Sequence, residues 1–410
     1  MRAIVTLTAL AAVLAALADA SHAASKPGFT PAPANCRNTG DFDGWLSGFK
    51  REAAAAGVSR ATLASVDGDL RLDESVIRKD RGQGVFGQPF LEFAGRMVEK
   101  SGRVAQGKAR IAKYRDAFAR IEQKYGVPAS VITGFWALET DFGANSGKTP
   151  IIPALATLAY DCRRGPMFRE ELLAALRIID QRKLPKDELI GAWAGEIGQM
   201  QFLPAHYLNY GVDFDGDGKV DLRNSVPDVL ASTANLLKGM GWRRSEPWLE
   251  EVRAPERMPW QEADIAIQHP RSIWAGWGVR RADGSALPSD GRKASLILPM
   301  GRNGPAFLAY DNFKVYTEWN QSFVYATTAA YLATRLDGAP PVNRGNGEVT
   351  PLNQAQSKEL QQLLARRGFD VGKLDGIIGL KTRQAVKAMQ LEFGMPADSY
   401  PTPELLSRLR

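Results

Sequence analysis

A nearly all-apolar stretch with one carboxylate inside it, residues 128–143, constrains the fold of this chain most strongly. It reads Pro-Ala-Ser-Val-Ile-Thr-Gly-Phe-Trp-Ala-Leu-Glu-Thr-Asp-Phe-Gly. The pattern predicts a helix from Pro128 to a stop at Gly143, because proline suits a first turn and glycine suits the residue after a helix. A helix with almost no polar face is a buried helix. At helical spacing Glu139 falls on the same stripe as Phe135, so the sequence places a carboxylate among aromatics.

Glu139 has two interpretations from this stretch alone. A buried carboxylate is costly unless it is paired with a cation, or neutral because burial has raised its pKa. Glu139 is therefore either a general acid or the structural partner of an arginine, for which Arg163 and Arg164 are candidates. A close arginine would lower the pKa of Glu139 and count against the acid role.

The first 23 residues predict a secretory signal peptide. Arg2 precedes an apolar core, and small residues stand at cleavage-site spacing up to Ala23. No other stretch approaches ~18 consecutive apolar residues, so we expect a soluble, exported protein without an integral membrane segment. Cys36, the first cysteine, lies too far from the cleavage point to carry a lipid anchor. The net charge of +7 suits an anionic partner, but the absence of basic runs with interleaved aromatics does not favour nucleic acid.

Two cysteines, Cys36 and Cys162, occur in the chain. In an exported protein an even pair predicts one disulfide, which would fasten the mature N-terminus to the body of the protein. The alternative is two unrelated free thiols. A metal site on the cysteines is not expected, because the whole chain has only three histidines.

Periodicity and turn residues divide the chain into a helical region, a strand-bearing region and a small C-terminal unit. The length of 410 residues is enough for two or three domains. We predict a domain over 36–337, a Pro- and Gly-rich linker over 338–351 and a three-helix unit over 352–410. The elements expected are helices over 41–70, 103–125, 149–180 with an interruption near Cys162, 185–195, 229–240 and 319–336, strands over 294–298 and 313–317, and a loop over 82–89.

Small residues and amides gather over residues 191–204. Gly195 and Gly198 flank a short run after Trp193, and two glutamines follow before Pro204. Small residues beside an aromatic and amides indicate backbone close to a ligand in a groove. Tight helix packing is the alternative interpretation.

Residues 213–221, Asp-Phe-Asp-Gly-Asp-Gly-Lys-Val-Asp, match the first nine positions of a calcium-binding EF-hand loop. Asn224 stands where such a loop has a bidentate glutamate, a loss that a downstream carboxylate could compensate. We therefore expect weak calcium affinity, about 0.1–1 mM. The alternative is an acidic turn without an ion. The expected ligands are Asp213, Asp215, Asp217, the carbonyl of Lys219, Asp221 through water, and Asp228.

These segments together resemble the lytic murein transglycosylase B family, followed by a peptidoglycan-binding module. The resemblance is carried by residues 135–143, 193–204, the aspartate loop, Gly-Pro-Ala-Phe-Leu-Ala-Tyr-Asp-Asn-Phe at 304–313 and Trp-Asn-Gln-Ser at 319–322. In the C-terminal unit, the residues that resemble a three-helix peptidoglycan-binding repeat are Leu360, Gln361, Asp375, Gly376, Gly379, Thr382, Ala385 and Gln390.

The resemblance implies an α+β protein with a mainly helical, lysozyme-like catalytic region, a small β-containing lobe and a deep glycan groove. Its partner would be the peptidoglycan glycan strand in the periplasm, and the protein would act as a monomer. No cofactor would be required for the chemistry, and a bound calcium ion would be structural. The family's single catalytic glutamate aligns with Glu139. It would protonate the oxygen leaving C1 of N-acetylmuramic acid and then deprotonate that sugar's 6-hydroxyl, which closes onto C1. The product would be a 1,6-anhydro end formed without water.

Other site residues are implied position by position. Gln201 matches a residue that contacts sugar, and Asn320 and Tyr325 match residues that line the catalytic pocket. Trp319 stands where the family has an aromatic residue, often tyrosine. For Trp193, sugar stacking and core packing both stay open. Ala192 stands where the family often has a serine, and Leu236 stands where it has an aromatic residue. These replacements put single glycan contacts in question but do not affect Glu139.

A second carboxylate would indicate a hydrolase, because such enzymes flank the scissile bond with two acids. Asp141 lies two residues from Glu139 and so points to a different helix face. At Glu196 the family usually has a small or apolar residue. The hypotheses that stay open beside the transglycosylase are a muramidase that hydrolyses the same bond, a non-catalytic wall-binding protein, and a calcium sensor, which a lone loop in an enzyme-sized domain does not favour.

Overall fold

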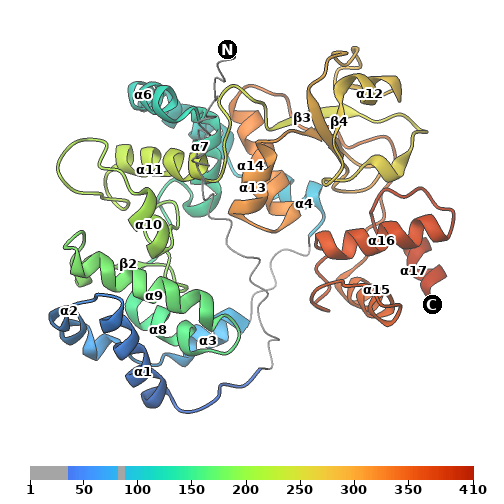
Figure 1. Cartoon of the computed structure of the whole chain (residues 1–410). Helices are drawn as coiled ribbons and strands as arrows, with labels where there is room; N and C mark the ends of the chain where they lie inside the picture. Colours follow the sequence, from blue (N-terminus) through green and yellow to red (C-terminus); the bar gives the residue numbers. More distant parts are fainter. Residues whose placement is uncertain (1–35, 82–87) are drawn as a thin grey trace, which may run out of the picture.

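The computed structural model describes residues 36–81 and 88–410 as a mainly helical body with one small sheet and a C-terminal helical unit (Figure 1). The predicted signal peptide and most of the predicted loop over 82–89 lie outside the described residues. Within the described part, none of the helices is both long and apolar enough to cross a membrane.

The first half of the described chain is helical. Short 3-10 turns occur at Asp67–Asp69 and Lys186–Glu188, a π-helical turn occurs at Gly95–Glu99, and β1 (Thr149–Pro150) pairs with β2 (Ile190–Gly191). The helices are α1 (Phe42–Ala55), α2 (Arg60–Ser65), α3 (Glu74–Arg81), α4 (Phe90–Ala94), α5 (Arg103–Lys113), α6 (Arg115–Tyr125), α7 (Ala129–Thr140), α8 (Ile151–Tyr160), α9 (Gly165–Asp180), α10 (Pro204–Tyr210) and α11 (Val226–Gly239).

The second half contains the sheet and the C-terminal helices. The sheet has the strand order β4-β6-β7-β3-β5, and its neighbouring strands are antiparallel. Its strands are β3 (Leu249–Arg253), β4 (His269–Pro270), β5 (Arg280–Arg281), β6 (Lys293–Ile297) and β7 (Ala306–Ala309). A 3-10 turn lies at Trp260–Glu262, and the helices are α12 (Arg271–Gly276), α13 (Phe313–Trp319), α14 (Phe323–Leu336), α15 (Gln354–Arg366), α16 (Leu380–Glu392) and α17 (Pro403–Leu409).

Some predicted elements were wrong. The helix expected over 185–195 is a 3-10 turn followed by β2, because pairing with β1 extends the chain there and Gly195 has φ +90°. The strand expected over 313–317 is helix α13, since a short apolar run does not distinguish strand from buried helix. The helices expected over 41–70 and 103–125 each break in two, and the last predicted helix begins at Phe323 rather than 319.

Helix α7 lies in the main core, as its composition predicted. Pro128 is the residue just before the helix, one position earlier than expected, and the chain leaves the helix at Asp141 in a left-handed conformation. Gly134 allows α7 to approach α14 closely. A Cβ at Gly134 would lie 3.5 Å from the backbone nitrogen of Ala333 and 3.6 Å from the carbonyl oxygen of Ala329. The two helices therefore pack backbone against backbone beside the position of Glu139.

The C-terminal helices have a core of their own. Leucines from α15 and α17 meet apolar residues of α16, and Figure 1 shows the unit next to the sheet. Its buried residues are Leu360, Leu364, Val371, Ala385, Val386, Met389, Leu405, Leu406 and Leu409. Arg383 of α16 lines one small pocket together with Leu298, after β6, and Phe323, at the start of α14.

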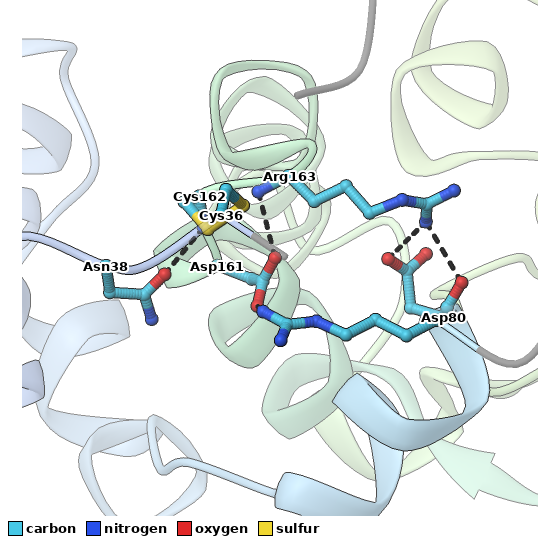
Figure 2. Close-up of a disulfide and its surroundings, with 7 residues drawn as sticks. Cys36, Asn38, Asp80, Asp161, Cys162 and Arg163 are labelled. Atoms are coloured by element: carbon cyan, nitrogen blue, oxygen red, sulfur yellow. Dashed lines mark hydrogen bonds and ion pairs between the residues drawn. A yellow bond between two sulfur atoms is a disulfide. The ribbon is translucent and has the colours of Figure 1, made fainter. Parts of the chain in front are cut away.

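Cys36 and Cys162, which the sequence predicted to pair, are joined by a disulfide (Figure 2). Asn38 strengthens the junction, because its Oδ1 accepts a hydrogen bond from the backbone N–H of Cys162 at 2.7 Å. The bond fastens the first described residue to the turn between α8 and α9. It closes a loop across a sequence separation of 126 residues.

Replacing both Cys36 and Cys162 with serine should destabilise the helical body. A cross-link across so long a loop restricts the unfolded chain, so we expect a loss of about 2–4 kcal/mol in the free energy of unfolding. Thermal unfolding of the oxidised wild type and the double variant measures the difference. A reductant should lower the melting temperature of the wild type and leave that of the double variant unchanged. Equal melting temperatures for the two proteins without reductant would contradict this expectation.

Candidate active site

The Glu139 carboxyl is held by two side chains from distant parts of the chain. Trp319 at the end of α13 donates its Nε1–H to Glu139 Oε1 at 2.8 Å, and Tyr325 on α14 donates its hydroxyl to the same oxygen. The Trp319 ring packs against Phe135, with ring centroids 4.4 Å apart. Helix α7 therefore presents the acid to an aromatic wall built by the α13–α14 junction.

Burial raises the pKa of the Glu139 carboxyl, and the hydrogen bonds from Tyr325 and Trp319 act in the opposite direction. Glu139 is partly exposed along its side chain, but the packing around its carboxyl is dense enough for burial to be the main influence on its pKa. Burial and the neighbouring Glu139 charge hold the pKa of Tyr325 well above its usual value, so the Tyr325 hydroxyl remains a donor.

Among the described residues, no arginine pairs with Glu139. Arg163 and Arg164 both bind the carboxylate of Asp80 (Figure 2 shows the Arg163 pair), and Asp80 is buried. Only burial, Tyr325 and Trp319 shift the pKa of Glu139. A close arginine, which would have counted against an acid role for Glu139, is therefore not seen in the described part of the chain.

Gln199, in the segment over 191–204, binds this segment to helix α7, which carries Glu139. Its Oε1 accepts a hydrogen bond from Trp136 Nε1 at 2.8 Å, and its backbone oxygen accepts one from the Thr140 hydroxyl at 2.6 Å. Gly143 is required here for two reasons: its φ is +91°, and a Cβ would lie 2.5 Å from Gln199 Oε1. Trp136 is thus a core residue, and the segment packs against the acid-bearing helix. A glycan groove along this segment stays a prediction.

The residues expected to bind substrate take different positions. Gln201 has φ +52° and donates through its side-chain amide to the Gly198 carbonyl at 3.0 Å. Asn320 accepts the backbone N–H of Ser322 through Oδ1 at 2.9 Å, so it shapes the turn before α14. Trp193 is partly buried against the main core. Of the five residues, the structure brings Trp319 and Tyr325 directly onto Glu139.

Glu196 is a second buried carboxyl group near Glu139. Its Oε2 is buried and has no hydrogen-bond partner among the described residues. Burial raises the pKa of Glu196, Arg164 opposes this, and the charge of Glu139 raises it further. In the sequence, the small or apolar residue that the family usually has at this position counts against Glu196. Residue type alone does not show that its carboxyl is buried within the electrostatic reach of Glu139.

The aspartate loop gathers three of the predicted ligands. One carboxylate oxygen each from Asp213, Asp215 and Asp217 lies within 4.8 Å of the others. Asp221 accepts the backbone N–H groups of residues 223 and 224, and the buried Asp228 accepts those of residues 214, 215 and 221. Three hard oxygen donors fit a calcium ion. Asp228 instead ties the loop to helix α11.

The architecture and the enclosed acid define a class: a mainly helical, lysozyme-like fold with a small curled sheet. Residues 41–334 match the transglycosylase SLT domain family, and residues 353–409 match a peptidoglycan binding domain. The chain therefore belongs to the lytic transglycosylase family of the SLT type, with a C-terminal domain of the peptidoglycan-binding kind.

Several known proteins are similar to this chain. The crystal structure of SltB3 from Pseudomonas aeruginosa in complex with NAG-anhNAM-pentapeptide has 40% sequence identity and a TM-score of 0.82, covering 91% of this chain and all of that one. Escherichia coli Slt35 in complex with calcium has 27% identity and a TM-score of 0.61, covering 75% of this chain and 98% of that one.

Membrane-bound lytic murein transglycosylase B of Escherichia coli is 33% identical over 215 residues, which are 52% of this chain and 58% of that protein. The match thus spans a little over half the length of that curated relative.

Replacing Tyr325 with phenylalanine should raise the pKa of Glu139 further. The hydroxyl stabilises the charged carboxylate, so its removal favours the protonated form. NMR of 13C-labelled glutamate side chains, with Glu139→Gln to assign the signal, would follow the titration. Tyr331→Phe is a matched control, because Tyr331 lies on the same helix and binds Glu99 instead. A lowered or unchanged Glu139 pKa in Tyr325→Phe would contradict this account.

Proposed function

We propose that this chain is an exported lytic transglycosylase that cleaves the β-1,4 bond between N-acetylmuramic acid and N-acetylglucosamine in peptidoglycan. The observation that carries the proposal is the Glu139 carboxyl, whose pKa burial raises while Tyr325 and Trp319 fix its position. The likeness to SltB3, whose crystal structures hold NAG-anhNAM-pentapeptide and NAG-NAM-pentapeptide, supports the same class of ligand.

Glu139 acts first as an acid and then as a base. Because both donors bind Oε1, the acidic proton resides on Oε2, from which it passes to the glycosidic oxygen as the bond to C1 breaks. The resulting carboxylate takes the proton of the 6-hydroxyl of the same sugar, and that oxygen bonds to C1. The proton given in the first step is regained in the second, so no water is consumed and a 1,6-anhydro end forms.

The remaining parts of the chain have supporting roles in this proposal. Residues 1–23 direct export to the periplasm, where the Cys36–Cys162 disulfide is stable. The catalytic domain over residues 36–337 cleaves the glycan. The linker over 338–351 joins it to the domain over 352–410, which binds peptidoglycan.

A muramidase that uses water is the second candidate, and Glu196 is the observation that favours it. A carboxylate beside the acid could act as a base for water or as a nucleophile. Burial, however, raises the pKa of Glu196 and so disfavours the carboxylate form that either role needs. The transglycosylase is therefore the better supported of the two.

Replacing Glu139 with glutamine should lower the release of muropeptides from purified sacculi by about 10²–10⁴-fold, the usual contribution of a general acid–base group. Asp141→Asn is the matched control: it makes the same amide change two residues away, at a carboxylate that pairs with Arg103 at 3.2 Å. The control should retain activity. Wild-type release no greater than that of Glu139→Gln would instead support a non-catalytic binding protein.

Product analysis in 18O-labelled water separates the two enzyme candidates in the same assay. Anhydro ends without 18O support the transglycosylase. Reducing ends that carry 18O, together with loss of activity in Glu196→Gln, would establish the muramidase.

We propose further that Asp213, Asp215, Asp217 and the carbonyl of Lys219 hold a structural calcium ion. The likeness to the calcium complex of Slt35 supports this ion. No catalytic step involves this site, so a chelator should leave the products unchanged.

Calcium should raise the melting temperature with a dissociation constant of about 0.1–1 mM. At ten times that constant the stabilisation should be about 1.4 kcal/mol. Asp215→Asn should remove the shift, while Asp116→Asn, at an exposed carboxylate on α6, should retain it. A shift that persists in Asp215→Asn would place the ion elsewhere.

A further inference from the structure

Arg383, on helix α16, is buried where the C-terminal unit meets the helical body. Its side chain is 8% exposed, and its guanidinium lies 5.1 Å from the ring centroid of Phe323 and 6.0 Å from that of Tyr400. Arg383 Nη2 donates to the backbone oxygen of Leu298 at 2.6 Å. One side chain of the C-terminal unit therefore contacts both the end of the sheet and the start of α14.

Burying the Arg383 guanidinium at this junction carries a desolvation penalty. Burial disfavours the charged form of Arg383, and the nearby carboxylates of Asp398 and Asp264 offset only part of this without forming a direct ion pair. Contact with aromatic faces offsets another part of that penalty. What the arrangement provides is geometry: a planar group fixes the Phe323 ring, and that ring belongs to the first residue of α14.

The start of α14 also builds the wall around the acid. Ser322 caps the helix by accepting the backbone N–H of Tyr325, and Asn320 accepts the backbone N–H of Ser322. Tyr325, two residues after Phe323, donates to Glu139. Any shift of the first turn of α14 therefore moves the Tyr325 hydroxyl relative to the carboxyl.

We infer that Arg383 is a positioning residue, which acts from the C-terminal unit through Phe323 to hold Tyr325 against Glu139. The C-terminal unit would then support catalysis itself as well as bind peptidoglycan. The inference rests on the proposed acid–base role of Glu139.

Other contacts of the C-terminal unit reach loops beside the sheet, and one of them provides a control. Lys387, on the same helix, pairs with Asp264 at 2.8 Å, with both side chains largely buried. Asp398 accepts the backbone N–H of Arg302 at 2.9 Å. Asp264 and Arg302 belong to loops beside the sheet. Lys387→Met removes this ion pair but keeps the contacts of Arg383 with Phe323 and Leu298, although Asp264 also acts on the charge of Arg383.

The experiment compares Arg383→Met with Lys387→Met in the full chain. Hydrogen exchange over residues 319–328, read by mass spectrometry, should be faster in Arg383→Met and unchanged in Lys387→Met. With a soluble glycan strand, Arg383→Met should lower kcat by about 10-fold, because small misplacements of catalytic groups are expensive, and should leave KM unchanged. Its pH profile should move to higher pH, since a weaker bond from Tyr325 raises the pKa of Glu139. Glu196, whose pKa the charge of Glu139 raises, is the same in both variants and does not distinguish them.

Wild-type exchange and a wild-type pH profile in Arg383→Met would overturn the inference, as would equal effects of the two variants. Phe323→Leu removes the ring and keeps the arginine, so it should reproduce the Arg383→Met pattern and decides the question if Arg383→Met does not fold. The exchange measurement needs no catalysis. If the wild type releases no glycan, the proposed function fails while exchange still tests the contact.

Discussion

The site depends on the competition between burial and hydrogen bonding at one carboxyl group. Burial in the aromatic wall favours the protonated form of Glu139, whereas the Tyr325 and Trp319 donors favour the carboxylate. Burial is the larger influence, so the group stays a usable acid, and the donors remain to stabilise the carboxylate once the proton has left. An arginine in place of these neutral donors would have fixed the charge. In the proposed mechanism, the neutrality of the two donors is what would allow one carboxyl to serve first as an acid and then as a base.

The sequence predicted the acid but not what holds it. Helix α7 was predictable because proline, glycine and an apolar run act locally, and Glu139 stood out because it contradicts that run. Trp319 and Tyr325 lie 180 and 186 residues further along the chain, and periodicity says nothing about contacts at such separations. The resemblance to a known family was what placed them at the site. Their hydrogen bonds to Glu139 are visible only in the structure.

The errors in the predicted fold have the same origin. The segment over 185–195 has helix-compatible residues, but Gly191 pairs with Thr149 in a strand ribbon, and a Cβ there would lie 1.7 Å from the carbonyl oxygen of Glu196. The segment over 313–317 has strand-like residues, yet it is a helix whose Phe313 and Tyr316 are buried in the main core. In both places tertiary packing prevails over local preference, and both segments border the site.

Helix α7 is supported at its active end from two independent directions. On one side the α13–α14 junction binds the Glu139 carboxyl. On the other side Gln199 binds Trp136 and Thr140 of the helix, and its amide donates to the Arg223 carbonyl at 2.7 Å, next to the aspartate loop. Asp228 joins that loop to α11 through three backbone N–H groups. The aspartate loop is therefore linked to Glu139 through a chain of structural hydrogen bonds. For this reason we propose a role in stability for the loop, and we propose that the α13–α14 side positions the proton.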